Sequence, residues 1–345
     1  MDLLFGVAAR GPRFFADGWG DRVLCDAIEP EAIFGRPIPA IRLRLGETKR
    51  AFGGLLFEGS FDSPEERLPA CARAARVRVL LPEGEPRGAA VHLAASGDQG
   101  FAVRLRFAAP LLERGIGAVV LENAYYGSRR PENQIGPAIR SVSDLHLMGS
   151  ATFQEGRALL RWLRDGLRMP LVGVTGYSMG GQMAAMVGAA VPFPCAVVPI
   201  APTCSPDSVL KSGFIRHVAH WAALVRDGED AEAARRGLCA LLARFSVTAL
   251  PPPRCPDAAI VVGTAQDGVV PPSEMNRIAS HWGAELRWLD AGHVSAVLRH
   301  QGDMRRAVLD AFDRLEAALR RVPPSGPSRP GPGRRPRGSG PRAPG

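Results

Sequence analysis

The chain has 345 residues, of which 46% are hydrophobic and 22% charged, a balance typical of a globular protein that can bury one sizeable core. Its apolar stretches fall short of the roughly 20 residues that a membrane-spanning helix needs, so no transmembrane segment is expected. The formal net charge is +9, but five arginines and no acid lie in the last 24 residues; this leaves +4 for the rest, and a nucleic-acid partner is not expected.

Strand-like apolar runs alternate with helical stretches through most of the chain, which predicts a mostly parallel sheet covered by helices on both faces. We expect this α/β domain to occupy residues 1–321. The predicted strands are residues 76–81, 89–93, 117–121, 171–175, 196–200, 258–263 and 285–289, and the predicted helices are residues 102–113, a stretch from Ser141 and Ser143 to about residue 164, 179–190 and about 303–320.

The connection between the strands that end near residue 200 and start near residue 258 is too long for an ordinary loop. We predict a helical cap at about residues 203–250. Two sets of apolar residues recur there at helical spacing: Phe214, Val218, Trp221 and Val225, and Ala234, Leu238, Leu241 and Phe245. The apolar face of each predicted helix either packs on the sheet or forms a lid over the active site, and the sequence leaves both open.

The last segment, residues 322–345, consists almost entirely of Pro, Gly, Ser and Arg. Such a composition buries little apolar area, so we predict a disordered tail. A solvated appendage is the expected role, and a weak peripheral contact with an anionic membrane is the alternative.

The sequence GYSMG at residues 176–180 matches G-x-S-x-G, the strand-to-helix turn that holds a strained serine at the carboxyl edge of a sheet. An apolar run, LVGVT, precedes this serine and a helix-forming run, MGGQMAAMVGAA, follows it, as the motif requires. A side chain at Gly176 or Gly180 would collide with the neighbouring strand and helix. Ser178 is therefore the candidate nucleophile, and an idle serine in a tight glycine turn is the alternative.

A serine nucleophile needs a general base, and the base needs a partner that fixes its tautomer. With this type of turn, the order along the chain is Ser, acid, His. Asp267 follows the apolar run AAIVVGTAQ, and His293 lies 26 residues later, after the run ELRWL. Both positions are loops at the ends of strands, on the edge where Ser178 emerges. We predict His293 as the base and Asp267 as the acid, with Asp290 as the runner-up acid.

Acyl transfer also needs N–H donors for the developing oxyanion, normally the amide after the nucleophile and one from the loop after an earlier strand. Met179 supplies the first donor. The run VHL leads into the loop at residues 94–98, where we place the second donor at the Ser96 amide, with Ala95 as the fallback. The alternative is a simple glycine turn without a catalytic role.

Several separate motifs occur in order along the chain: RFFADGWG near the N-terminus, ENAYYG at residues 122–127, VSDLHLMG at 142–149, GYSMGG at 176–181 and AGHVSA at 291–296. Together they resemble the family of α/β-hydrolase domain-containing protein 18, over nearly all of the chain except the tail. The resemblance implies an α/β-hydrolase fold with a small helical cap. It also assigns the triad roles to Ser178, Asp267 and His293.

The sequence departs from the family pattern after Gly97 and Asp98. Relatives tend to have histidines and an aromatic pair where residues 99–102 read QGFA, and this loop borders the predicted oxyanion donors. The substrate therefore does not carry over directly. The resemblance points to lipid acyl chains and, as an alternative location, to mitochondria.

All three tyrosines of the chain, Tyr125, Tyr126 and Tyr177, lie beside these motifs, and we predict them as substrate-binding residues. For Tyr125 and Tyr126 a packing role is the alternative, because a buried tyrosine needs a hydroxyl partner with or without substrate.

These observations predict a serine hydrolase that cleaves a carboxylic ester or thioester through an acyl-enzyme on Ser178, without a metal or an organic cofactor. The expected partner is a small-molecule or lipid ester. The alternative is a catalytically silent interaction protein with the same fold. The acyl-chain length, the head group and the oligomeric state stay open.

The cysteines and the N-terminus indicate the compartment. Six cysteines are scattered without a C-x-x-C pair, which suits a reducing environment and argues against a zinc site. Asp2 stands where a signal peptide has positive charge, so we expect a cytoplasmic protein. Arg10 and Arg13 also fit an organellar transit signal, which keeps a mitochondrial or membrane-peripheral location as the alternative.

Overall fold

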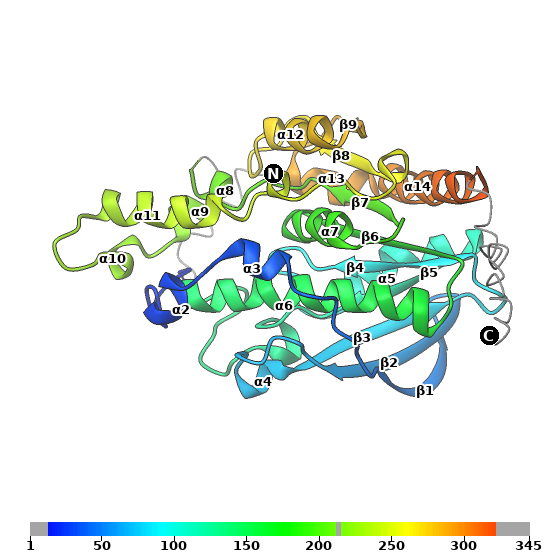
Figure 1. Ribbon diagram of the computed structural model, residues 1–345, viewed down its shortest axis with the longest axis horizontal. Helices are drawn as coiled ribbons and strands as arrows, with labels where there is room; N and C mark the ends of the chain where they lie inside the picture. Colours follow the sequence, from blue (N-terminus) through cyan, green and yellow to red (C-terminus); the bar gives the residue numbers. More distant parts are fainter. Residues whose placement is uncertain (1–12, 212–214, 322–345) are drawn as a thin grey trace, which may run out of the picture.

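The computed structural model describes residues 13–211 and 215–321, which contain a mixed nine-stranded sheet (Figure 1). The strands in chain order are β1 (Arg44–Ala51), β2 (Gly54–Asp62), β3 (Ala74–Leu81), β4 (Gly88–Leu93), β5 (Ile116–Leu121), β6 (Leu171–Tyr177), β7 (Ala196–Ile200), β8 (Ile260–Thr264) and β9 (Glu285–Leu289). The predicted tail at residues 322–345 lies outside the described residues.

The order of the strands across the sheet is β1-β2-β3-β5-β4-β6-β7-β8-β9. The three pairs from β1 to β5 are antiparallel, and every pair from β5 to β9 is parallel. The carboxyl ends of β4 to β9 therefore meet at one edge of the sheet, where ligands bind in open α/β folds.

Helices cover both faces of the sheet. The longer helices are α5 (Ala102–Ala108), α6 (Val142–Arg161), α7 (Met179–Ala190), α11 (Ala231–Ala243), α12 (Pro272–Trp282), α13 (His293–Arg299) and α14 (Gln301–Arg321). Alternate residues of β6 serve the two faces: Val172 and Val174 pack with α6, α7 and α12, whereas Leu171 packs with α14. This arrangement confirms the predicted mostly parallel sheet between helical layers.

Two short segments differ from the sequence prediction. The predicted helix 102–113 ends at Ala108 and continues as a 3-10 helix (Ala109–Arg114), because Pro110 has no amide proton and its ring clashes with the preceding turn. The hairpin of β1 and β2 was not predicted, since β1 is almost fully exposed and its sequence, RLGETKRA, lacks an apolar face.

The segment predicted as a cap contains α8 (Asp207–Lys211), α9 (Ile215–Val218), α10 (Trp221–Leu224) and α11, which extend from one end of the sheet beside α2 (Arg22–Asp26) (Figure 1). The expected continuous helix through Val218, Trp221 and Val225 is wrong, and Phe214 lies outside the described residues. The backbone of Ala219 instead forms a β-bridge with Phe14. The amide of Phe14 donates to Val218 and that of His220 donates to the carbonyl of Phe14, which interrupts the helix.

The remaining short helices are α3 (Pro30–Phe34) and α4 (Ala70–Arg73). Across residues 13–211 and 215–321, none of the helices combines the length and the apolar character that a bilayer crossing requires.

Candidate active site

Ser178 stands between β6 and α7 in a strained backbone conformation, with φ 56° and ψ −118°. The surrounding glycines make this turn possible. A Cβ at Gly176 would lie 2.3 Å from the carbonyl oxygen of Gly180, and a Cβ at Gly180 would lie 2.4 Å from the carbonyl oxygen of Leu93 in β4. The turn therefore has the steric requirements that the G-x-S-x-G pattern predicts.

Three side chains from three different strand ends meet in a hydrogen-bonded chain. His293, the first residue of α13 after β9, has its Nε2 atom 2.9 Å from Ser178 Oγ. Its Nδ1 atom lies 2.7 Å from Asp267 Oδ2, in the loop after β8. The runner-up acid, Asp290, is exposed and accepts a hydrogen bond of 2.7 Å from Gln266 instead.

The carboxylate of Asp267 is fully buried and accepts hydrogen bonds on both oxygens. Thr264 Oγ1 donates to Oδ2 at 2.5 Å, and the amides of Val269 and Val270 donate to Oδ1 at 2.8 Å each. Burial works against ionisation, but the hydrogen bonds from His293, Thr264 and the backbone outweigh it, so the pKa of Asp267 lies below its usual value. An ionised Asp267 fixes Nδ1 of His293 as a donor, which makes Nε2 the acceptor toward Ser178 Oγ.

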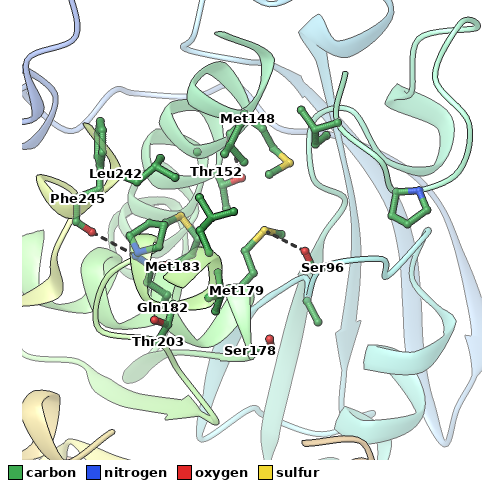
Figure 2. A pocket seen from close by; sticks show the side chains of 18 of the residues that line it. Ser96, Met148, Thr152, Ser178, Met179, Gln182, Met183, Thr203, Leu242 and Phe245 are labelled. Atoms are coloured by element: carbon green, nitrogen blue, oxygen red, sulfur yellow. Dashed lines mark hydrogen bonds between the residues drawn. The ribbon is translucent and has the colours of Figure 1, made fainter. Parts of the chain in front are cut away.

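The loop after β4 lies beside the nucleophile. Ser96 Oγ is 3.8 Å from Met179 Sδ, and both residues line the same cavity as Ser178 (Figure 2). This position agrees with the expected source of a second oxyanion donor, and the roles of the Ser96 and Met179 amides stay predictions.

Arg104, which no sequence motif marks, anchors this loop. Its buried guanidinium donates to the carbonyl oxygen of His92 at 3.0 Å and to the carboxylate of Asp98 at 2.6 Å, and also to the carbonyl oxygens of Gly100 and Leu121. Arg104 thus joins the loop to the ends of β4 and β5. The only sequence signal is an arginine in the first turn of a predicted helix, which is too common to single out.

A cavity of about 660 Å³ has Ser178 in its wall and is lined by residues of α6, α7 and the cap. Its wall is largely apolar and includes Met148 of α6, Met183 of α7, Leu242 of α11 and, just beyond that helix, Phe245 (Figure 2). The C-terminal part of the cap therefore borders the cavity that holds the nucleophile, as the lid interpretation requires. A volume of this size is typical of small-molecule sites.

The three tyrosines occupy different environments. Tyr126 and Tyr177 line the cavity, and the hydroxyl of Tyr177 donates to the carbonyl oxygen of His293. Tyr125 does not line it: the ring is buried in a cluster with Leu68 and Leu147, and burial raises the pKa of its phenol. Tyr125 therefore has the packing role that was the alternative prediction. It could contact a substrate in the cavity only if the surrounding cluster rearranged.

Among the described residues, no group of three or more His, Cys, Asp and Glu side chains is arranged to hold a metal ion. His217, one of the two histidines of the cap, accepts a hydrogen bond from Arg216 at the surface.

Comparison with known proteins agrees with this architecture. Acetyl xylan esterase 1 from Thermoanaerobacterium sp. JW/SL YS485 superposes with a TM-score of 0.60 and 17% identity, over 89% of this chain and 98% of that one. An acetyl xylan esterase from Paenibacillus sp. R4 gives a TM-score of 0.56 and 14% identity, over 82% and 97% of the two chains. At these identities the likeness concerns the fold alone, which is the α/β-hydrolase fold.

Sequence relatives extend the comparison. The Mycobacterium tuberculosis (strain CDC 1551 / Oshkosh) protein named "Uncharacterized protein MT2702" is 24% identical over 304 residues, which cover 83% of this chain and 70% of that protein. The family model described as alpha/beta hydrolase domain containing 18 matches residues 12–236 and 226–314. Because this match spans most of the chain, the protein belongs to the family of alpha/beta hydrolase domain containing 18.

Proposed function

We propose that this protein is a serine hydrolase that cleaves a carboxylic ester or thioester with an apolar acyl group, through an acyl-enzyme on Ser178. The observation that carries the proposal is the continuous chain from Ser178 Oγ to His293 Nε2 at 2.9 Å and from His293 Nδ1 to Asp267 at 2.7 Å. A hydroxyl in this arrangement has both a general base and a fixed tautomer of that base.

In the first half of the reaction, His293 Nε2 takes the proton of Ser178 as Oγ attacks the acyl carbonyl carbon. The carbonyl oxygen becomes an oxyanion, which the amides of Met179 and Ser96 would stabilise by hydrogen bonds. The imidazolium then gives its proton to the leaving alkoxide or thiolate, and the acyl-enzyme remains.

In the second half, His293 removes a proton from a water molecule, whose oxygen attacks the acyl-enzyme. Collapse of the second tetrahedral intermediate releases the carboxylic acid, and the proton on His293 returns to Ser178. Asp267 stays ionised throughout and stabilises the imidazolium in both halves. Its low pKa and complete burial support this assignment.

The cavity supports an apolar acyl group as the substrate class. Its walls carry methionine, leucine and phenylalanine side chains, and an acyl chain that enters it gains about 0.8 kcal/mol per buried methylene. A lipid acyl chain is one member of this class. The chain length and the alcohol or thiol that leaves are separate questions.

The proposal is tested with p-nitrophenyl esters, because their hydrolysis needs no knowledge of the natural leaving group. The wild-type protein should hydrolyse them, and Ser178→Ala should reduce kcat by about 10⁴-fold or more. Thermal unfolding of both proteins serves as the control for folding. Equal rates for the wild type and the variant would exclude Ser178 as the nucleophile.

A further inference from the structure

The cavity is lined along α7 by a row of methionines. Met179, Met183 and Met186 are spaced by four and three residues, so they share one face of the helix, and all three line the cavity. At 1.5 Å per residue, Met183 lies about 6 Å and Met186 about 10 Å beyond Met179 along the helix axis. The row therefore leads away from Ser178 into the protein.

Three aromatic rings also belong to the cavity wall. Phe34 contacts Phe153 of α6 with ring centroids 5.6 Å apart, and it contacts Phe245 of the cap at 6.4 Å. All three rings line the cavity. Phe153 belongs to the same buried cluster as Met186, which is only 2% exposed, and Phe34 and Phe245 pack against that cluster. In Figure 2, Met183 lies between Met179 and the side chains of Leu242 and Phe245. We call the part of the wall formed by these three rings and Met186 the aromatic end of the cavity.

Polar groups along the wall are hydrogen-bonded within the protein or carry no charge near pH 7. Gln182 Nε2 donates to the carbonyl oxygen of Phe245 at 3.2 Å, and Thr152 Oγ1 donates to that of Met148 at 2.8 Å. Burial lowers the pKa of His146 to about 4, so its imidazole is neutral near pH 7. The wall thus suits a hydrocarbon chain better than a charged head group.

We propose that Met183 and Met186 set the length of the acyl chain that Ser178 accepts. This inference rests on the proposed hydrolase function. Each methylene transferred from water to the cavity contributes about 0.8 kcal/mol, which is about four-fold in kcat/KM. The gain stops when the chain reaches the aromatic end. Met183 narrows the path midway, and Met186 occupies its end.

The test measures kcat/KM for p-nitrophenyl esters from acetate to decanoate and finds the chain length at which the four-fold increase stops. Met183→Phe adds bulk midway, so the increase should stop at a shorter chain, and the ratio of octanoate to acetate should fall by about ten-fold or more. Met186→Ala empties the end, so the increase should continue to longer chains. Met186→Val is the milder variant, with a smaller shift in the same direction.

Met304→Ala is the matched control. Met304 is also 2% exposed but lies in α14 on the opposite face of the sheet, so the variant should keep the wild-type profile of chain lengths. Labelling of Ser178 with a fluorophosphonate probe distinguishes a failure of the proposed methionine role from a failure of the proposed hydrolase function. Variants that are labelled and active but stop at the wild-type chain length overturn the proposed role of the methionines. Absence of labelling in the folded wild type overturns the hydrolase function itself.

Discussion

The buried carboxylate of Asp267 shows how single residues shape this site. A carboxylate without solvent is costly unless hydrogen bonds compensate it. Here His293, Thr264, Val269 and Val270 all donate to it. The compensation keeps the pKa low, so the negative charge is available to orient the imidazole over a wide range of pH.

Replacing Asp267 with asparagine tests this role. The amide group of Asn would favour the wrong tautomer of His293, so kcat should fall by about 10⁴-fold while the protein still folds. Steady-state kinetics with a p-nitrophenyl ester measure the loss, and circular dichroism monitors folding. A folded Asp267→Asn protein with nearly full activity would show that Asp267 is not the orienting carboxylate.

Tyr177 is a positioning residue for His293. Its hydroxyl donates to the backbone carbonyl of His293, and its ring lies 5.2 Å from the imidazole between centroids. One hydrogen bond of this kind is worth about 1 kcal/mol. Tyr177→Phe should therefore lower kcat by about five-fold and leave KM nearly unchanged.

Tyr125→Phe is the control for that variant, since its ring lies outside the cavity and its kcat should stay near the wild-type value. The pH profile of kcat adds a second readout, because a displaced imidazole changes the profile and a purely structural loss does not. A rise in KM alone would assign Tyr177 to substrate binding instead.

At the scale of elements, the N-terminal segment, residues 14–28, packs with the cap in one hydrophobic cluster. Trp19 Nε1 donates to the carbonyl oxygen of Leu224 in α10 at 2.8 Å, and the guanidinium of Arg226 lies 4.4 Å from the centroid of the indole ring. Phe14 and Phe15 line the cavity together with the end of α11. The segment therefore forms part of the cavity wall beside the cap.

Trp19→Phe keeps an aromatic ring but removes the donor to Leu224. We expect a loss of about 1 kcal/mol in the free energy of unfolding and faster limited proteolysis within residues 203–250. Trp288→Phe, at a ring that is 42% exposed, is the control and should leave the proteolysis pattern unchanged. Identical cleavage of the wild type and Trp19→Phe would mean that the segment does not hold the cap.

Much of the fold could be predicted because the central strands, such as β5 and β6, are continuous apolar runs and because glycines mark the turn at Ser178. The three triad residues could be predicted because each follows a strand and because they occur in the order Ser, acid, His. The break after Val218 could not, since it depends on backbone hydrogen bonds with Phe14, over 200 residues away. Arg104 was missed because most of its partners are carbonyl oxygens, which carry no sequence signal, and its one acidic partner, Asp98, does not by itself distinguish this arginine from the others.

At the scale of the whole molecule, buried histidines link stability to pH. His92 in β4 is 2% exposed, and its Nε2 is buried without a hydrogen-bond partner among the described residues. Burial, with the nearby charge of Arg104, lowers its pKa from 6.5 to about 3. The unfolded chain therefore binds a proton between these values that the folded protein does not.

The contribution of His92 to the free energy of unfolding is therefore greatest above about pH 6.5 and decreases as the pH falls toward 3, by at most about 1.4 kcal/mol per pH unit. His92→Leu should flatten this dependence and cost little at pH 7, because it removes an unpaired buried nitrogen. Urea unfolding between pH 4 and 8 measures both effects. Parallel pH curves for the wild type and the variant would show that His92 is not a source of the acid sensitivity.

The central claim is that Ser178 is the nucleophile and that it depends on His293. The direct measurement is reaction of the folded wild-type protein with a fluorophosphonate probe, followed by digestion and mapping of the tagged peptide. We expect the tag on Ser178, little labelling of His293→Ala, and none at that position in Ser178→Ala, with all three proteins unfolding cooperatively at similar temperatures. A folded wild-type protein that stays unlabelled, or a tag on another serine, would contradict the account.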